Sequence, residues 1–221
     1  MTVSRTPPDT VADFLRTLGD TPPERVLWTP QPGTATEEEA VRLNAGFPRR
    51  RVELVNGTLV EKPMGTRESY LAFTLIGHLF VYQRTHNLGV FGAPDALMRL
   101  AAGLVRLPDV HFTSWANLPA DSAHLRPVVD YPPDLAVEIL SESDRPGALA
   151  QKVREYFAAG TRVVWVIDQE ERTARVYTTA DEFATLTAAD TLDGGEVLPG
   201  FALPLAELFD EPQLNPRPPQ A

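Results

Sequence analysis

One stretch near the middle of the chain constrains the fold more than any other, because it places a charged residue inside an apolar run. Residues 134–141 read Asp-Leu-Ala-Val-Glu-Ile-Leu-Ser after a Pro-Pro pair, a pattern typical of a buried strand that follows a turn. Glu138 stands in the middle of this strand. Burying its carboxylate costs several kcal/mol unless a cation compensates the charge. We therefore expect a cation, either a lysine or a metal ion, beside Glu138.

The composition narrows the classes of protein that the chain can represent. The 221 residues suffice for a domain with a full core. The absence of cysteine excludes disulfides and thiolate metal sites, and four scattered histidines do not form a zinc cluster. A net charge of -10 weighs against a broad basic surface for nucleic acid but permits a local basic cleft. With no membrane-spanning run and no secretory signal, we expect a cytoplasmic protein without a membrane partner.

The clearest local structure is a β-hairpin over residues 51–62. Two apolar stretches flank Asn56-Gly57, the pair that most readily adopts the positive φ angles of a type I′ turn. Alternation puts Glu53 and Val55 on one side of the first strand. Glu53 is either an acid beside a site or a solvated carboxylate on an edge strand, and the pattern alone favours the solvated carboxylate.

Helical and strand patterns account for most of the remaining chain. The widest apolar stripe, with Leu71, Leu75, Leu79 and Phe80, belongs to a long predicted helix. Helices are expected over residues 10–18, 36–45, 67–86 and 144–159, the last one capped by Ser143 or Asp144. Strands are expected over 88–91, 97–100, 104–113, 134–140, 162–168 and 173–177.

The order of these elements predicts the fold class. A strand, a helix and a strand over residues 134–168 predict two parallel strands joined by a crossover helix. Pro108 within the strand over 104–113 indicates an edge position or a bulge. We expect a single α/β (α+β) domain, in which the helices over 66–87 and 144–159 cover a mixed sheet.

Three residues on neighbouring predicted elements form a candidate site. Asp109 lies on one strand, Glu138 on the neighbouring strand, and Lys152 on the helix that follows, with Tyr156 one turn later. Two nearby carboxylates need a cation between them, and their hard oxygen atoms suit Mg²⁺ or Mn²⁺. A lysine beside such an ion can orient an attacking water. These are the parts needed for metal-assisted phosphodiester hydrolysis.

Each of these residues also has a simpler explanation. Asp109 and Asp134 follow prolines and are common in turns. Lys152 could lie on the surface and bridge to Glu155, and Glu68 falls in the first turn of a predicted helix, where a negative charge suits the helix dipole. The pattern alone therefore leaves both the site and its structural alternatives open.

Taken as an ordered set, the motifs resemble a known family. Four segments carry the resemblance: VELVNGTLVEKPMG, RLPDVHF, PPDLAVEILSESDR and KVREYFAAGTRVVWVIDQEERTARVY. In these segments the chain resembles the Uma family of restriction endonucleases, which is part of the PD-(D/E)XK nuclease superfamily. The resemblance covers about residues 50–210 and implies a restriction-endonuclease-like fold with an acidic, Mg²⁺-dependent site. It divides the chain into an N-terminal extension with short helices over 1–48, the nuclease-like domain over 49–210 and a Pro-rich tail over 211–221.

The resemblance also implies roles for individual residues. Asp109 and Glu138 match the two metal-binding acids, Glu53 matches the acid of the hairpin motif, and Lys152 with Tyr156 behind it matches the lysine of the following helix. Two positions depart from the pattern. Leu140 stands where the superfamily usually has its lysine, and Thr66-Arg67-Glu68 replaces a histidine at the start of the long helix, where Glu68 can serve as an additional acid.

These expectations combine into one hypothesis and its rivals. The chain is expected to be a Mg²⁺-dependent or Mn²⁺-dependent endonuclease that hydrolyses phosphodiester bonds, with DNA as the expected nucleic-acid partner and a homodimer as its assembly. The first alternative is a catalytically silent nuclease-fold module that acts in binding or dimerisation, which the net charge and Leu140 favour. A metal-free acid/base hydrolase of small molecules is the second alternative and requires a deep pocket.

Overall fold

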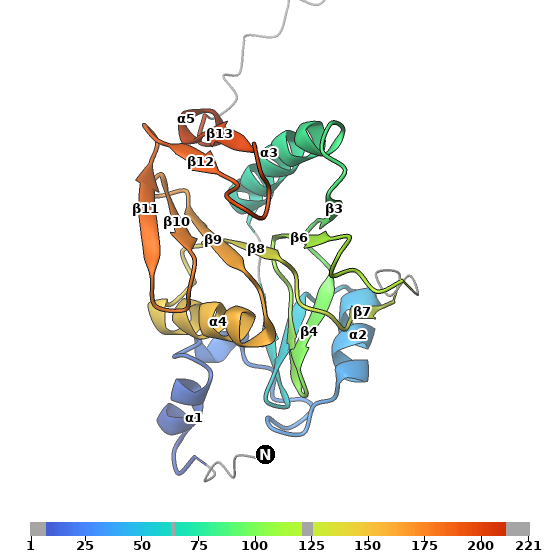
Figure 1. The fold of residues 1–221 in the computed structure, drawn as a ribbon. Coiled ribbons are helices and arrows are strands. Elements are labelled where there is room, and N and C mark those ends of the chain that lie inside the picture. The colour runs from blue at the N-terminus through green and yellow to red at the C-terminus, as the bar shows by residue number, and fades with distance from the viewer. Residues whose placement is uncertain (1–7, 63–64, 121–125, 211–221) are drawn as a thin grey trace, which may run out of the picture.

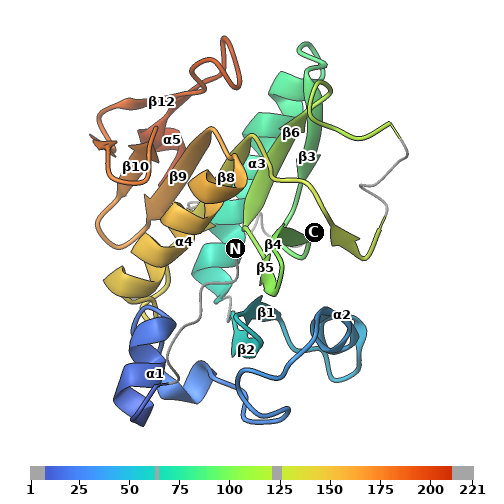
Figure 2. The same ribbon diagram turned by 60° about the horizontal axis from the view of Figure 1, so that its bottom comes forward.

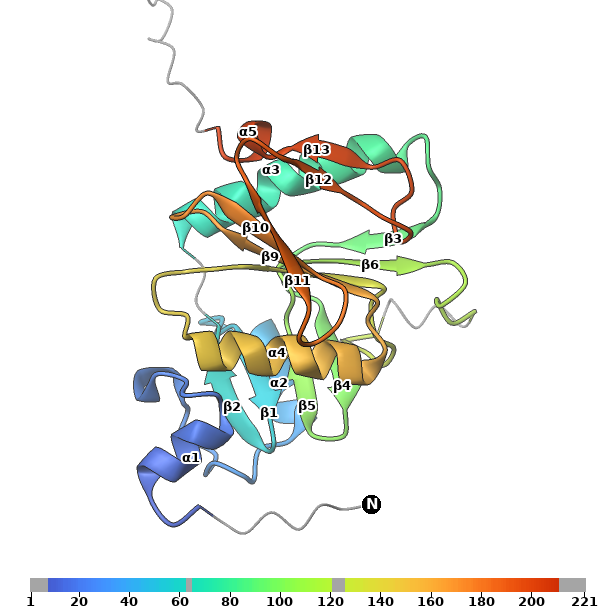
Figure 3. The same ribbon diagram turned by 60° about the vertical axis from the view of Figure 1, so that its left-hand side comes forward.

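Two mixed β-sheets meet at the helix α4 (Pro146–Ala159) (Figure 1). The structure is a computed structural model that describes residues 8–62, 65–120 and 126–210. Helix α4 lies between the sheets, and its apolar residues contact both β4 and β9 (Figure 3). The predicted Pro-rich tail at 211–221 falls outside the described residues. This arrangement confirms the predicted fold class of a mixed sheet structure flanked by helices.

The larger sheet has six strands in the order β11-β10-β9-β8-β6-β3. Its strands β8 and β9 run parallel and are joined through α4, whereas β9 and β10 form an antiparallel hairpin, as predicted. The strands are β3 (Gly89–Gly92), β6 (Val110–Ser114), β8 (Leu135–Ile139), β9 (Val163–Asp168), β10 (Thr173–Tyr177) and β11 (Phe183–Thr187).

Strand β8 lies in the middle of this sheet, and its side chains alternate between two covered faces. Leu135, Val137 and Ile139 pack in the core under the helix α3 (Thr66–Gln83). Ala136 packs on the opposite face, against α4. Because successive residues of a strand point to opposite faces, Glu138 shares the α4 face with Ala136. The carboxylate is thereby directed into the layer between the two sheets.

The smaller sheet has five strands in the order β2-β1-β5-β4-β7. Its β1–β2 hairpin turns at Asn56 and Gly57, whose φ angles of 50° and 72° confirm the predicted turn with two left-handed residues. The strands are β1 (Val52–Val55), β2 (Thr58–Glu61), β4 (Leu97–Ala101), β5 (Leu104–Arg106) and β7 (Val128–Val129). A two-stranded sheet of β12 (Thr191–Asp193) and β13 (Ala202–Pro204) lies beside α3 and α5 (Leu205–Leu208) (Figure 1).

The prediction of one strand over residues 104–113 is wrong. The segment divides into β5 and β6, which belong to different sheets, and the chain crosses between the sheets at Leu107, Pro108 and Asp109. Pro108 has no N–H group to continue a ladder, which explains why pairing stops there. Neither half is an edge strand, because β5 lies between β1 and β4 and β6 lies between β3 and β8.

Side-chain caps account for the starts of two helices. Thr10 caps α1 (Val11–Thr17), and Thr36 forms the predicted capping box with Glu39 at α2 (Glu37–Ala45). The predicted cap of α4 is wrong, because its N-cap is Arg145. The Asp144 carboxylate instead accepts a 2.9 Å hydrogen bond from the Ser141 N–H and pairs with Arg25 at 3.0 Å.

Helix α3 buries only one side of its surface. Leu71, Leu75 and Leu79 are buried as predicted, but Phe80 is 59% exposed. Phe80 lies on the outer face of the helix with Phe73, about two turns earlier, which is also exposed. Of the helices in the described ranges, none is long and apolar enough to cross a membrane.

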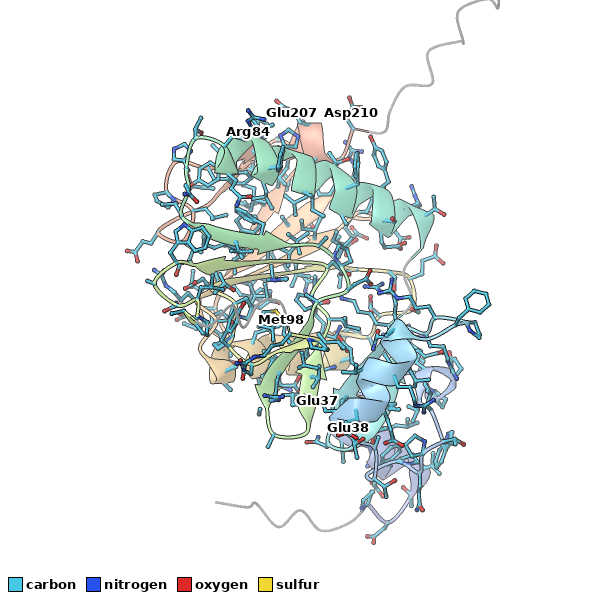
Figure 4. All side chains as sticks on the ribbon, turned by 90° about the vertical axis from the view of Figure 1, so that its right-hand side faces the viewer. Glu37, Glu38, Arg84, Met98, Glu207 and Asp210 are labelled. Atoms are coloured by element: carbon cyan, nitrogen blue, oxygen red, sulfur yellow. The ribbon has the colours of Figure 1, made fainter. Side chains whose placement is uncertain are left out.

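The N-terminal residues pack on the smaller sheet (Figure 2). The Leu27 N–H donates to the Leu59 carbonyl at 2.9 Å, after the short helix η1 (Pro23–Arg25). Figure 4 shows α2, with Glu37 and Glu38 labelled, beside β4, which carries Met98. Arg99 on β4 pairs with both carboxylate oxygens of Glu37. The predicted boundary at residue 48 stays a prediction.

Candidate functional site

A cluster of charged side chains is buried where the two sheets meet α4. Every member is at most 8% exposed, although charged residues are seldom buried without partners. The members come from both sheets, from the crossing segment between β5 and β6, and from α4. We call this set the ionic cluster: Glu53, Lys62, Arg106, Asp109, Glu138, Lys152 and Tyr156.

Glu138 is the centre of the ionic cluster. Its Oε2 atom lies 2.8 Å from Nζ of Lys62 and 3.3 Å from Nζ of Lys152. Its Oε1 atom accepts a 2.7 Å hydrogen bond from the Tyr156 hydroxyl. The cation expected beside Glu138 is therefore present as two lysine side chains.

Asp109 is held against Glu138 by the pairing of β6 with β8. Its main-chain N–H donates to the Val137 carbonyl at 2.9 Å, and its Oδ2 atom accepts from the Ile139 N–H at 2.9 Å. The other oxygen, Oδ1, lies 3.0 Å from Nζ of Lys62. Asp109 and Glu138 thus share a cation, as the sequence predicts for two adjacent carboxylates.

Lys62 is one of two cluster members that were not predicted from the sequence. It follows β2 directly, and its ammonium contacts the Leu107 carbonyl at 2.6 Å as well as Glu138 and Asp109. One signal points to it: among 20 basic residues the chain has only two lysines, Lys62 and Lys152, and both contact Glu138. All other basic positions are arginine, so lysine occurs in this chain only inside the ionic cluster.

Lys152 and Tyr156 project from the same side of α4, as their spacing predicts. Lys152 lies between two carboxylates, 3.1 Å from Oε1 of Glu53 and 3.3 Å from Oε2 of Glu138. The alternative of a surface lysine that bridges to Glu155 is wrong, because Lys152 is buried and Glu155 pairs with Arg106 instead.

Glu53 anchors the side of the ionic cluster that comes from the smaller sheet. It is 1% exposed, which rules out the alternative of a solvated edge carboxylate. Arg106, a second residue that the sequence reasoning missed, donates to Oε2 of Glu53 at 2.7 Å and also pairs with Glu155. The Leu107 N–H donates to Oε1 of Glu53 at 3.2 Å.

Burial and charge act in opposite directions on these groups. Burial alone would raise the pKa of Glu138, but Lys152 and Lys62 outweigh it and hold the pKa below its usual range. The pKa of Glu53 is lowered against burial by Lys152, Arg106 and Lys62. Burial and the Glu138 carboxylate together raise the pKa of Asp109. Burial alone would lower the pKa of Lys62, but Asp109 and Glu138 outweigh burial and raise it, so this lysine stays charged.

One side of the ionic cluster contains unsatisfied polar atoms. Among the described residues, Oδ1 of Asp109 accepts no hydrogen bond of good geometry, although Lys62 is within ion-pair distance. The Nη1 and Nη2 atoms of Arg51 are also buried without a hydrogen-bond partner in this part of the chain, and Nη2 lies 3.8 Å from the same oxygen. Buried polar atoms of this kind commonly mark the place of an additional ligand or water.

A small cavity adjoins the ionic cluster, and a wider cleft lies beside that cavity. A small cavity of about 20 Å³ touches Glu53, Glu138 and Lys152, and this volume suffices for one water molecule. A wider cleft of about 430 Å³ opens beside it and shares the side chains of Leu140, Asp144 and Leu149.

The structure does not bring Glu68 into the ionic cluster. Glu68 lines the wider cleft at the start of α3. Leu140, at the position where the superfamily usually has its lysine, lines both the cleft and the small cavity.

The oxygen atoms around Lys62 resemble the ligand set of a hard cation. Three oxygen atoms surround a single position, which the Lys62 ammonium occupies. They belong to the carboxylates of Asp109 and Glu138 and to the Leu107 carbonyl. Mg²⁺ commonly binds one or two carboxylates and completes its shell with water. Within the described ranges, no group of three His, Cys, Asp or Glu side chains could hold a metal ion. The two carboxylates and the Leu107 carbonyl nevertheless supply three oxygen ligands for a divalent ion whose shell water would complete, at the position that the Lys62 ammonium occupies.

Comparisons with known proteins identify the family of the chain and a similar fold. Residues 38–206 match the model of the Uma2 family, described as "Putative restriction endonuclease". Among solved structures, the chain is similar to "a putative nuclease belonging to DUF820" from Anabaena variabilis, with a TM-score of 0.66 and 18% identity over 78% of this chain and 96% of that chain. At this identity the likeness shows the fold alone. No curated protein matches the chain.

Proposed function

The chain belongs to the Uma2 family, and from this premise we propose that it is a metal-dependent endonuclease that hydrolyses phosphodiester bonds in DNA. One observation carries the proposal. Two carboxylates and a carbonyl converge on one cation position, and a lysine and a cavity for a single water lie directly beside them. These are the groups that metal-assisted hydrolysis requires.

Each residue has a distinct task in this proposal. Asp109 and Glu138 would hold Mg²⁺ or Mn²⁺, which when bound offsets the charge on the phosphate and favours ionisation of water. Lys152 would orient the attacking water, since it lines the small cavity. Glu53 assists the metal site and positions Lys152 through their 3.1 Å contact, and Tyr156 orients Glu138 through its hydrogen bond.

The wider cleft is the proposed entrance for the substrate. Arg67, Arg145 and Arg175 line it and offer guanidinium groups to a phosphate, although five acidic residues share the lining and leave the cleft without a net positive charge. Glu68 lies in the same cleft, where we assign it the role of an additional acid. Because Leu140 cannot supply the lysine usual at its position, the proposal depends on Lys152 from α4.

The test is cleavage of supercoiled plasmid, single-stranded DNA and RNA in the presence of Mg²⁺ or Mn²⁺. We expect metal-dependent nicking of DNA that disappears in Glu138→Gln and Lys152→Met. Glu196→Gln is the matched control, since its side chain is 95% exposed on the surface. Cleavage that persists in Glu138→Gln would disprove the assignment of Glu138 as a metal ligand. Cleavage of RNA but not of DNA would identify RNA as the substrate.

The predicted homodimer belongs to the same proposal. Nucleases of this fold often cut two strands with two subunits, and light scattering of the purified protein measures its mass directly. A monomer at the concentrations that cleave plasmid would contradict the dimer while leaving the active site unaffected.

One observation favours a second candidate, the catalytically silent nuclease-fold module. Glu53, Asp109 and Glu138 each have a buried cation within the ionic cluster, so the protein does not need a metal to compensate their charge. Clean protein without cleavage of plasmid, single-stranded DNA or RNA in either metal would support this candidate.

A further inference from the structure

We propose that Lys62 is a displaceable internal counter-ion: its ammonium holds the position between Asp109 and Glu138, and a divalent cation enters only when this ammonium leaves. The inference rests on the proposed function for the assignment of Asp109 and Glu138 as metal ligands. It adds a residue that controls whether the site is loaded.

The first argument is the position of the ammonium. Nζ of Lys62 lies 2.6 Å from the Leu107 carbonyl, 2.8 Å from Oε2 of Glu138 and 3.0 Å from Oδ1 of Asp109. An ammonium has three donors, and three oxygen atoms surround this one. A magnesium ion needs its oxygen ligands at about 2.0–2.1 Å. The lysine and the ion therefore require the same oxygen atoms and cannot bind them at the same time.

The second argument is that the ammonium is free to leave without disrupting the sheet. Lys62 follows the last residue of β2, and its N–H bonds to the Arg51 carbonyl at 2.9 Å. Its head is a point charge on a flexible four-carbon stem, so the side chain can swing while the main chain stays paired.

The third argument is that the contact with Asp109 is incomplete. Oδ1 of Asp109 lies within ion-pair distance of both Lys62 and Arg51 but accepts no hydrogen bond of good geometry. This oxygen thus keeps a hydrogen-bonding capacity that neither Lys62 nor Arg51 uses. A ligand bond to a metal ion would satisfy it.

Lys152 provides the internal comparison. It contacts Glu138 and Glu53, at 3.3 and 3.1 Å, and its removal does not empty the position between Asp109 and Glu138. Both lysines are similarly buried and both contact Oε2 of Glu138. If metal affects Lys62 and Lys152 differently, the cause is therefore the place of the Lys62 ammonium between Asp109 and Glu138, and not only its positive charge.

Chemical labelling of wild-type protein tests displacement directly, because the chain has only these two lysines. Native protein is acetylated with and without Mn²⁺, and peptide mass spectrometry gives the labelling rate of each lysine, with the α-amino group as reference. We expect Mn²⁺ to accelerate labelling of Lys62 and not of Lys152. Unchanged labelling of Lys62 at Mn²⁺ concentrations that saturate the protein in calorimetry would overturn the proposal.

A variant gives a second measurement. We expect Lys62→Met to bind Mn²⁺ more tightly than wild type by about tenfold or more, which corresponds to about 1.4 kcal/mol. Lys152→Met, the matched control, also removes a buried positive charge beside Glu138 but leaves the Lys62 ammonium in place, so it is expected to gain less than Lys62→Met. If Lys62→Met does not fold, the labelling of the wild type decides alone.

The outcomes separate this proposal from the proposed function. Equal Mn²⁺ affinity in wild type and Lys62→Met, without a change in labelling, would mean that the lysine is not displaced, while plasmid cleavage would still support a nuclease. Absence of Mn²⁺ binding in both proteins would overturn the displacement proposal, and the plasmid assay would then decide separately whether the nuclease function also fails.

Discussion

The Tyr156 hydroxyl donates a 2.7 Å hydrogen bond to Oε1 of Glu138, while both lysines approach Oε2 of the same carboxylate. Tyr156 is fully buried, and burial together with the negative charge of Glu138 raises the pKa of its hydroxyl well above the usual value. The hydroxyl therefore stays protonated and fixes the plane of the carboxylate.

Tyr156→Phe should lower the stability of the protein by about 2 kcal/mol, because a buried hydrogen bond to a charged group contributes about this much. The ring stays in place, so the packing of α4 is preserved. Urea denaturation measures the effect. Tyr177→Phe is the control, since Tyr177 is also buried but its hydroxyl makes no hydrogen bond within the described structure. Equal losses in the two variants would contradict the role of Tyr156.

Arg106→Lys should destabilise the protein although it preserves the charge. The guanidinium holds Glu53 at 2.7 Å and Glu155 at 2.6 and 2.7 Å at the same time, and a lysine ammonium cannot reproduce this fork. We expect a loss of about 2 kcal/mol in chemical denaturation. Arg154→Lys on the exposed side of α4 is the control and should be neutral. A neutral Arg106→Lys would show that charge alone is sufficient.

Asp144 should contribute stability at neutral pH that disappears in acid. Burial opposes its ionisation, but Lys152, the Ser141 N–H and Arg25 hold its pKa below the usual value. A carboxyl with a lowered pKa in the folded state stabilises the protein above the pKa of the unfolded chain, about 3.9, and loses this contribution as pH falls through the folded value. The stability difference between wild type and Asp144→Asn should therefore shrink as pH falls below about 4. A difference that is constant with pH would contradict this prediction.

Leu140→Lys should restore part of the cleavage lost in Lys152→Ala. Leu140 follows Glu138 by two residues, on the same face of the strand, and lines both the small cavity and the cleft. A lysine there would direct its ammonium toward the proposed water. Plasmid nicking measures the recovery. Leu149→Lys in the same background is the control, because Leu149 borders the same hollows from α4. Equal recovery in both variants would indicate a nonspecific effect of charge.

Several members of the ionic cluster were predictable because they break a local pattern. Glu138 interrupts an apolar strand, Asp109 follows a proline next to that strand, and Lys152 with Tyr156 has the spacing of one helical face. Signals of this kind can be recognised from residues that are close in the sequence. The hairpin at Asn56-Gly57 and the parallel pair β8–β9 were predictable for the same reason.

Lys62 and Arg106 were not predictable from local pattern. A lysine after a hairpin strand and an arginine in a short strand are ordinarily solvated, and only the meeting of two sheets buries them. The break between β5 and β6 has the same origin. Pro108 interrupts the strand locally, but only the tertiary structure determines that the two parts join different sheets.

The wall of the small cavity extends beyond the segment that defines the family. Leu18, Thr21 and Arg25 line it together with Glu53 and Glu138, yet the family match begins at residue 38. Arg25 also reaches across to Asp144, at the mouth of the wider cleft. A protein trimmed to the matched segment would thus retain the catalytic candidates but lose this part of the cavity wall, so biochemical work on this chain needs residues 18–25 as much as its carboxylates.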